Sequence, residues 1–194
     1  MLFDQEPAGP GIDREKILQA VEAAPHLELA AESLGLPGNG ESPAVELFTD
    51  GGASPNPGPG GWAFILRADA GSDREREVEG AGAVVATTNN RMELTAVIRG
   101  LLHLEHPCSV RLVSDSEYVI KGLTEWIEGW KKRNWRNSKR KPVLNEDLWR
   151  ILDRLASYHQ ISAEWTRGHA GHPENERCDE LVERMREDLS EGSA

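Results

Sequence analysis

The sequence predicts a mixed α/β fold in which helices pack on the faces of a sheet, and three observations support this prediction. VELFT at residues 45–49 has the pattern of a strand, and GGWAFILR follows it after a Gly/Pro-rich turn, which is typical of a β-hairpin. The short apolar run at residues 110–113 is typical of a buried parallel strand. Helical segments separate the later strands, which favours a layered arrangement.

The order of elements along the chain is βββαβα…αβα, with five strands. After the hairpin, the sequence predicts a mostly polar edge strand at 74–83, a helix at 89–103, the buried strand at 110–113, short helices at 118–122 and 125–130, a basic loop, a helix at 145–158, a strand at 161–166 and a final helix at 174–188.

The first 43 residues differ from the rest and predict a short helical extension ahead of a main domain at residues 44–190. Residues 13–24 have a helical pattern with Asp13 as the N-cap, and residues 27–36 have a second one. The linker at residues 37–43 contains two Gly and two Pro, which favours a domain boundary there. LELAAESLGLP resembles half of a helix-turn-helix, but its acidity favours a helical cap or a protein-docking arm instead.

The net charge of -11 is distributed unevenly, so it does not exclude a nucleic-acid partner. Residues 1–43 carry -6, the last twelve residues carry -2, and residues 44–182 carry only -3. The basic segment, residues 131–141 (KKRNWRNSKRK), holds seven basic residues and no acidic one. Because salt screens charges beyond about 10 Å, this local field decides contact with a polyanion.

The chain has neither a membrane-spanning run nor the basic-then-apolar start of a secretory signal, which indicates a cytoplasmic protein. Its two cysteines, Cys108 and Cys178, stand in unrelated contexts. They predict free thiols in a reducing compartment, because a disulfide framework needs more cysteines at patterned spacings.

Four carboxylates stand where a sheet of this kind gathers its ligands. Asp50 and Asp115 each end a predicted strand, while Glu93 and Asp179 lie in the first turns of helices. If the four converge, their mutual repulsion requires cations, and a set of hard oxygen ligands favours Mg²⁺ or Mn²⁺ over Zn²⁺. A single Asp at such a position is usually a turn or capping residue, and spacing does not show that the four meet.

Five segments resemble type 1 ribonuclease H of the bacterial kind, in the order of that family, over residues 45 to about 186. The segments are FTDGGASPNPGPGGWAFILR, TTNNRMELTAVIRGL, SDSEYVIKGL, EWIEGWKKRNWRNSKRKPVLNEDLW and WTRGHAGHPENERCDELV. The resemblance implies a ribonuclease H-like fold, a five-stranded mixed sheet with flanking helices and a basic protrusion. It implies an endonuclease that hydrolyses the RNA strand of RNA–DNA hybrids and leaves 5′-phosphate and 3′-hydroxyl ends.

The resemblance also implies the catalytic residues. Asp50, Glu93, Asp115 and Asp179 are expected to bind two Mg²⁺ ions, for which Mn²⁺ can substitute, and no small-molecule cofactor is expected. The ions activate water and stabilise the departing 3′ oxygen. His169, in the GHAGH loop, is expected to assist proton transfer and product release. His172 has no implied catalytic role and is interpreted as a loop or capping side chain.

The resemblance places substrate contacts in two regions, the turn and helix start beside the carboxylates and the basic segment that binds the DNA strand. The expected contact residues are Gly51, Gly52, Asn56, Asn89, Asn90, Trp126, Trp130, Lys131, Lys132, Arg133 and Trp135. Asn56 fits a turn former almost equally well, and spaced Trp residues are often core residues. Glu117 stands where many relatives carry Gln, and a carboxylate is a poor neighbour for phosphate.

Two other functions are compatible with the fold, a silent hybrid-binding module and a related integrase or junction resolvase. The presence of all four carboxylates with His169 argues against the silent module. The basic segment and GHAGHPENERCDE argue against the related nucleases. We expect a monomer. The N-terminal extension has no counterpart in the family pattern, and we expect it to contact the main domain or another protein.

Overall fold

The computed structural model describes residues 43–168 and 172–191. The predicted helices at 13–24 and 27–36, and His169, lie outside these residues. The elements are β1 (Ala44–Ala53), β2 (Gly58–Ala68), β3 (Arg76–Thr87), α2 (Asn89–Leu102), β4 (Ser109–Ser114), α3 (Glu117–Lys121), the π-helix η1 (Gly122–Trp126), α4 (Ile127–Lys132), α5 (Glu146–Tyr158), β5 (Gln160–Trp165) and α6 (Pro173–Glu191). Among them, no helix is long and apolar enough to cross a membrane.

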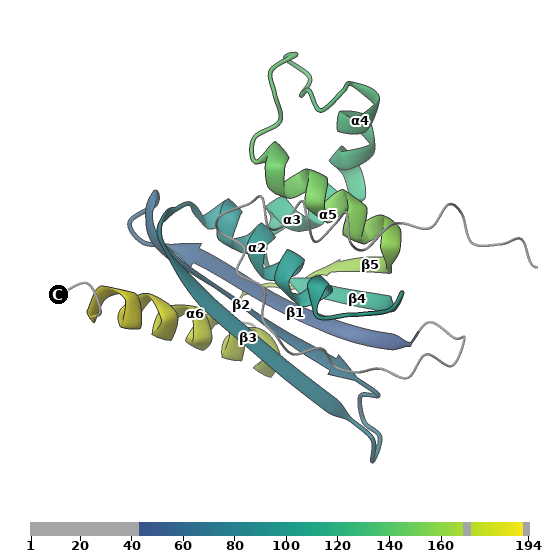
Figure 1. Ribbon diagram of the computed structural model, residues 1–194, viewed down its shortest axis with the longest axis vertical. Helices are drawn as coiled ribbons and strands as arrows, with labels where there is room; N and C mark the ends of the chain where they lie inside the picture. Colours follow the sequence, from purple (N-terminus) through teal and green to yellow (C-terminus); the bar gives the residue numbers. More distant parts are fainter. Residues whose placement is uncertain (1–42, 169–171, 192–194) are drawn as a thin grey trace, which may run out of the picture.

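The strands form one five-stranded sheet in the order β3-β2-β1-β4-β5 (Figure 1). The first three strands are joined as antiparallel neighbours, whereas β4 runs parallel to both β1 and β5. The predicted mixed sheet, with the polar strand β3 at one edge, is therefore confirmed.

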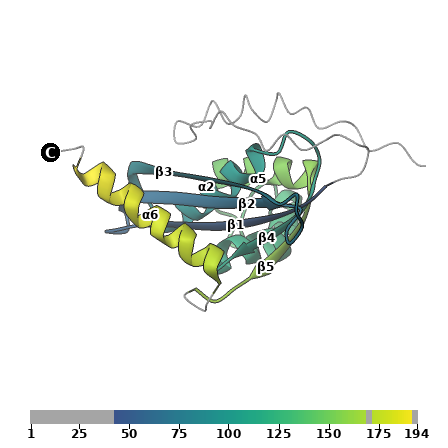
Figure 2. The ribbon, with the colours of Figure 1, turned by 90° about the horizontal axis from the view of Figure 1, so that it is seen from below.

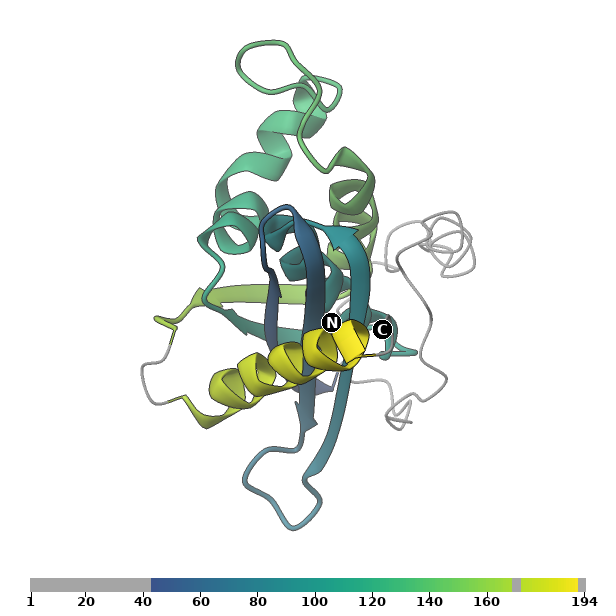
Figure 3. The ribbon, with the colours of Figure 1, turned by 90° about the vertical axis from the view of Figure 1, so that its left-hand side faces the viewer.

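Helices cover both faces of the sheet. Figure 2 shows α6 on the face opposite α2 and α5, and Figure 3 shows α6 crossing the strands. The central strands are buried on both sides, so neighbouring residues of one strand enter different cores. Leu47 and Leu112 belong to the larger core, which includes the residues of α2 and α5. Phe48 and Val113 belong to the smaller core, where they join Cys178 of α6.

Three parts of the chain differ from the sequence prediction. The edge strand predicted at 74–83 is shifted and runs on to Thr87. The first strand continues through Ala53, so the hairpin turn shortens to residues 54–57. The two short helices predicted at 118–130 belong to one continuous helical run over α3, η1 and α4. The run passes close to α5 at Gly122, where an ideal Cβ would lie 1.9 Å from Cη2 of the buried Trp149 ring. The sequence pattern does not reveal this contact, and it therefore predicted two helices with a break after Gly122.

We expect the Gly122→Ala variant to be less stable than the wild-type protein by about 1–3 kcal/mol, because a methyl group would overlap the Trp149 ring in a packed core. Urea unfolding followed by circular dichroism measures the difference. Gly129→Ala is the matched control in the same helical run, since its Cβ would meet only the mobile end of the Arg133 guanidinium at 3.0 Å. It should be neutral or stabilising by up to about 1 kcal/mol, as for Ala in a helix. Equal losses in both variants would contradict this account of the contact.

Candidate active site

Parallel pairing brings Asp50 and Asp115 together. Thr49 of β1 is the register partner of Ser114, the last residue of β4. Asp50 and Asp115 are the next residues of these two segments, so they lie side by side at the carboxyl end of β4, where Asp50 stays in β1 opposite Ala63 of β2. Ligand sites in α/β sheets form at this end of parallel strands.

Glu93 reaches the same place from α2, because Gly51 lets that helix approach β1 closely. An ideal Cβ on Gly51 would lie 2.5 Å from the Glu93 backbone nitrogen and 2.4 Å from the Met92 carbonyl carbon. Only a residue without a side chain fits between the helix and the strand. Gly51 was predicted to contact substrate through its backbone, and that stays a prediction; the structure adds this packing role.

The three carboxylates form one group, in which each side chain offers an oxygen within 4.8 Å of the others. Burial, followed by the charges of Asp50 and then Asp115, raises the pKa of Glu93 well above its ordinary value. Its Oε2 is buried and accepts no hydrogen bond from the described residues. A divalent cation would supply both the missing partner and the opposing charge, so these oxygen ligands fit Mg²⁺ or Mn²⁺.

Asp179 is not part of this group of three and approaches from the other face of the sheet. It is half-buried in the second turn of α6, directly after Cys178. The Cys178 thiol donates to the Phe48 carbonyl at 3.7 Å, and its pKa is raised by burial and then by the charge of Asp50. The first turns of α6 therefore lie against β1 near Asp50.

Two residues beside Asp115 were missed by sequence analysis. The indole N–H of Trp165, at the end of β5, donates to the Asp115 carbonyl at 3.0 Å. An ideal Cβ on Gly168 would lie 2.6 Å from Asp115 Oδ2. Both stand in WTRGH, directly ahead of His169, and that position was the only sequence signal available for them. His169 itself lies outside the described residues.

The predicted substrate residues Asn56 and Asn89 are joined by hydrogen bonds within the protein. Asn89 Oδ1 accepts from the Ala53 N–H at 2.7 Å, and Asn56 Oδ1 accepts from the Asn89 N–H at 3.3 Å. These bonds tie the β1–β2 turn to the start of α2. The side chain of Asn90 is half-exposed and makes no hydrogen bond with a described residue, so it is open to a ligand.

Two of the three tryptophans of the predicted DNA-binding region, Trp126 and Trp130, pack against each other, while Trp135 packs under the Arg150 guanidinium. Trp130 and Trp135 are buried, whereas Trp126 is partly exposed. The rings of Trp126 and Trp130 lie 5.7 Å apart, and the Trp130 and Trp149 rings lie 5.3 Å apart. These ring contacts attach α4 and the basic segment, together called the protrusion, to α5. Because Trp130 and Trp135 are buried, a structural role is favoured for both.

The cations of this region differ in whether a carboxylate of the protein neutralises them. Lys131 lies 2.9 Å from Asp153 and 3.1 Å from Glu128, so carboxylates already neutralise it. The guanidinium of Arg133 donates instead to the carbonyl of Arg136. Lys132 and Arg133 are exposed and form no ion pair with the part of the chain that the structure describes. They are therefore better placed than Lys131 to meet a phosphate.

Glu117, whose carboxylate is a poor neighbour for phosphate, is exposed and pairs with Lys121 at 2.5 Å. This pair lies within α3, just beyond Asp115.

Comparisons with known proteins match most of the chain to one family. Residues 42–187 match the RNase H family. A ribonuclease H from Halorhodospira halophila is 59% identical over 138 residues, which cover 71% of this chain and 89% of that protein. A ribonuclease H from Solibacter usitatus is 51% identical over 146 residues, covering 75% and 97%. The crystal structure of LC9-RNase H1, a type 1 RNase H with the type 2 active-site motif, matches with a TM-score of 0.67 and 28% identity, covering 76% of this chain and 74% of that one.

We expect Glu93→Gln to stabilise the metal-free protein while removing its response to metal. Because the pKa of Glu93 is raised in the folded state, ionising this carboxyl group costs free energy of folding, and the folded protein loses stability as pH rises through that pKa. Glutamine avoids this loss, so Tm in EDTA at neutral pH should rise by about 2–4 °C, the shift that corresponds to 1 kcal/mol. Near pH 4, where glutamates are close to their ordinary pKa, the difference should shrink. Added Mg²⁺ should raise the Tm of the wild type only; a lower Tm for the variant at neutral pH would refute the prediction.

We expect Gly51→Ala to weaken Mg²⁺ binding by about 10–100-fold, as changes that misplace a metal ligand do. Its methyl group would push α2, and with it Glu93, away from Asp50. Calorimetric titration with Mg²⁺ or Mn²⁺ measures the affinity. Gly52→Ala is the matched control for metal affinity, because an ideal Cβ at Gly52 meets no atom within 4 Å. Similar affinities for the two variants would rule out the spacer role of Gly51.

Proposed function

The chain belongs to the ribonuclease H family and is an endonuclease that hydrolyses the RNA strand of RNA–DNA hybrids; we propose that Asp50, Glu93, Asp115 and Asp179 hold two Mg²⁺ ions for this reaction. The observation that supports the metal assignment most strongly is the group of three carboxylates within 4.8 Å, one of which, Glu93, has a buried oxygen without a hydrogen bond from the described residues. Mn²⁺ offers the same oxygen preference and should substitute.

When bound, the metal ions supply a nucleophilic hydroxide near neutral pH and stabilise charge on the departing 3′ oxygen. Asp50 and Asp115 contribute oxygens from two adjoining parallel strands, and Glu93 contributes one from the helix above them. Asp179 is proposed as the fourth ligand on the resemblance and on the position of α6 against β1. We propose that His169 carries protons between the site and water, since imidazole titrates near neutrality.

We propose that the hybrid lies across the carboxylates and the protrusion, with the RNA strand at the carboxylates and the DNA strand on the basic segment. Asn90 and the exposed amide of Asn89 are positioned at the edge of the site, where an amide can donate to or accept from a ribose 2′-hydroxyl. Asn56 and the backbone of Gly52 stay proposed contacts. On the protrusion, Lys132 and Arg133 are the proposed phosphate contacts. Lys131 is proposed to bind phosphate more weakly, because two carboxylates already pair with it. Trp126 is the proposed ring contact, while Trp130 and Trp135 support it from the core.

We further propose that residues 44–190 act as a monomeric catalytic domain in the cytoplasm and that residues 1–43 form an accessory extension. One chain supplies all three grouped carboxylates, so the site needs no second copy. Cys108 and Cys178 are both free and buried, in keeping with a reducing compartment. Contact between the extension and the catalytic domain, or another protein, is part of the same proposal.

The experiment is cleavage of one labelled oligoribonucleotide that is single-stranded, paired with RNA, or paired with DNA. We expect cutting of the DNA-paired form alone, with Mg²⁺ and not with EDTA. Asp50→Asn should fold normally and lower the rate roughly a thousandfold or more, because several kcal/mol of metal-dependent stabilisation are lost. Binding of the hybrid without cutting by the wild type would indicate a silent module, and equal cutting of all three forms would overturn the hybrid specificity.

A further inference from the structure

One exposed aromatic ring lies directly beside the carboxylate group. Trp165, the last residue of β5, is 48% exposed and is one of three large hydrophobic residues that are exposed in the described part of the chain. The other two, Val85 and Leu144, are aliphatic. An indole normally buries most of its surface, whereas this ring is half open to solvent and its N–H is bonded to the backbone of a proposed metal ligand.

An uncompensated cation accompanies the ring. Arg167 is exposed and forms no ion pair with any residue in the ranges 43–168 and 172–191. The residue between the two, Thr166, is buried, and its backbone N–H donates to the Ser114 carbonyl at 3.0 Å. The buried Thr166 therefore anchors the segment to β4, while Trp165 and Arg167 remain accessible.

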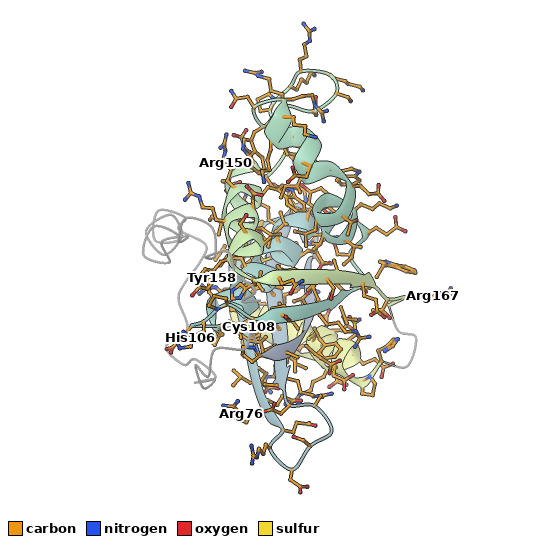
Figure 4. The ribbon with its side chains drawn as sticks, turned by 90° about the vertical axis from the view of Figure 1, so that its right-hand side faces the viewer. Arg76, His106, Cys108, Arg150, Tyr158 and Arg167 are labelled. Atoms are coloured by element: carbon orange, nitrogen blue, oxygen red, sulfur yellow. The ribbon has the colours of Figure 1, made fainter. Side chains whose placement is uncertain are left out.

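The chain around this pair is fixed to a proposed metal ligand. The Trp165 indole N–H donates to the Asp115 carbonyl, and Gly168 lies against Asp115 Oδ2. Arg167 stands between these two contacts in the sequence. Figure 4 shows Arg167 just beyond the C-terminal end of β5, well below the protrusion. The pair is thus a surface separate from the basic segment.

We propose that Trp165 and Arg167 form a second contact surface, which binds the sugar-phosphate backbone of the cleaved RNA strand next to the scissile phosphate. This inference rests on the proposed function. The strand that is cut must pass the carboxylates, so the exposed groups attached to Asp115 meet that strand before its partner. Arg167 supplies a phosphate contact, and the Trp165 ring packs against the adjoining ribose. Through its indole N–H, Trp165 is also a positioning residue for Asp115.

Removing the Arg167 guanidinium and removing the Trp165 indole should change the kinetics in different ways. Loss of a phosphate contact weakens substrate binding and makes it less dependent on salt, because one counterion fewer is released. Loss of the indole N–H leaves the Asp115 carbonyl without this donor and disturbs the metal ligand, which affects turnover. Kinetics at several KCl concentrations can separate these effects.

The experiment compares Arg167→Ala, Arg167→Lys, Trp165→Phe and Trp165→Leu on a short RNA–DNA hybrid. For Arg167→Ala we expect KM to rise about 3–10-fold, kcat to stay within about twofold, and the slope of log(kcat/KM) against log[KCl] to become shallower by about 0.9. Arg167→Lys should restore the slope. Trp165→Phe, which keeps a ring without the N–H, should lower kcat at nearly unchanged KM, whereas Trp165→Leu should also raise KM.

Arg74→Ala is the matched control, because Arg74 is exposed, carries no ion pair within the described residues and lies in the β2–β3 turn. That turn adjoins Arg76, at the end of the molecule away from Arg167 in Figure 4. The control should match the wild type in KM and in slope. If Arg167→Ala behaves like Arg74→Ala, the phosphate contact is refuted, and if Trp165→Phe and Trp165→Leu are alike, the ring does not touch RNA. Absence of hybrid cleavage by the wild type would instead refute the proposed function itself.

Discussion

Three carboxylates that repel one another are held within 4.8 Å because parallel pairing of β1 with β4 leaves no other position for two of them. The pairing ends at Thr49 and Ser114, and the next residue on each strand is an aspartate. Glu93 adds a third charge where burial makes charge costly, and its pKa rises accordingly. The buried sheet supplies the free energy that keeps this unfavourable group assembled, and a divalent cation turns the repulsion into a binding site.

The two-sided sheet determines how the remaining parts reach the site. Because β1 and β4 are buried on both faces, α2 can deliver Glu93 from one face while α6 brings Asp179 towards β1 from the other. Glycines set the closest approaches. Gly51 admits α2 to the strand, and Gly168 allows the chain after β5 to pass Asp115. Small errors of packing at either glycine would therefore appear as errors in ligand position, far more than as loss of the fold.

The protrusion separates two kinds of residue that alternate in the sequence. Trp126 and Trp130 form a chain of rings that ends on Trp149 of α5, and Trp135 is also buried, while Lys132 and Arg133 are exposed. Aromatic packing below exposed cations suits a polyanion whose sequence varies, since phosphates are alike at every step. Arg167 is a cation outside the protrusion, close in sequence to Gly168 at the carboxylates. It would allow the two strands of a hybrid to be held at separate places.

The sequence by itself determined the strand and helix order, the mixed sheet and the residue types of the site, because period, turn chemistry and family motifs are local properties. It identified Asp50, Glu93 and Asp115 as candidates, but only the tertiary structure showed that they meet, since convergence depends on the register between strands far apart in the chain. It was similarly unable to separate Trp126 from the buried Trp130, because spacing does not fix which side of a helix faces the core. The spacer role of Gly51 and the contact of Trp165 with Asp115 were decided by packing distances, which no sequence pattern encodes.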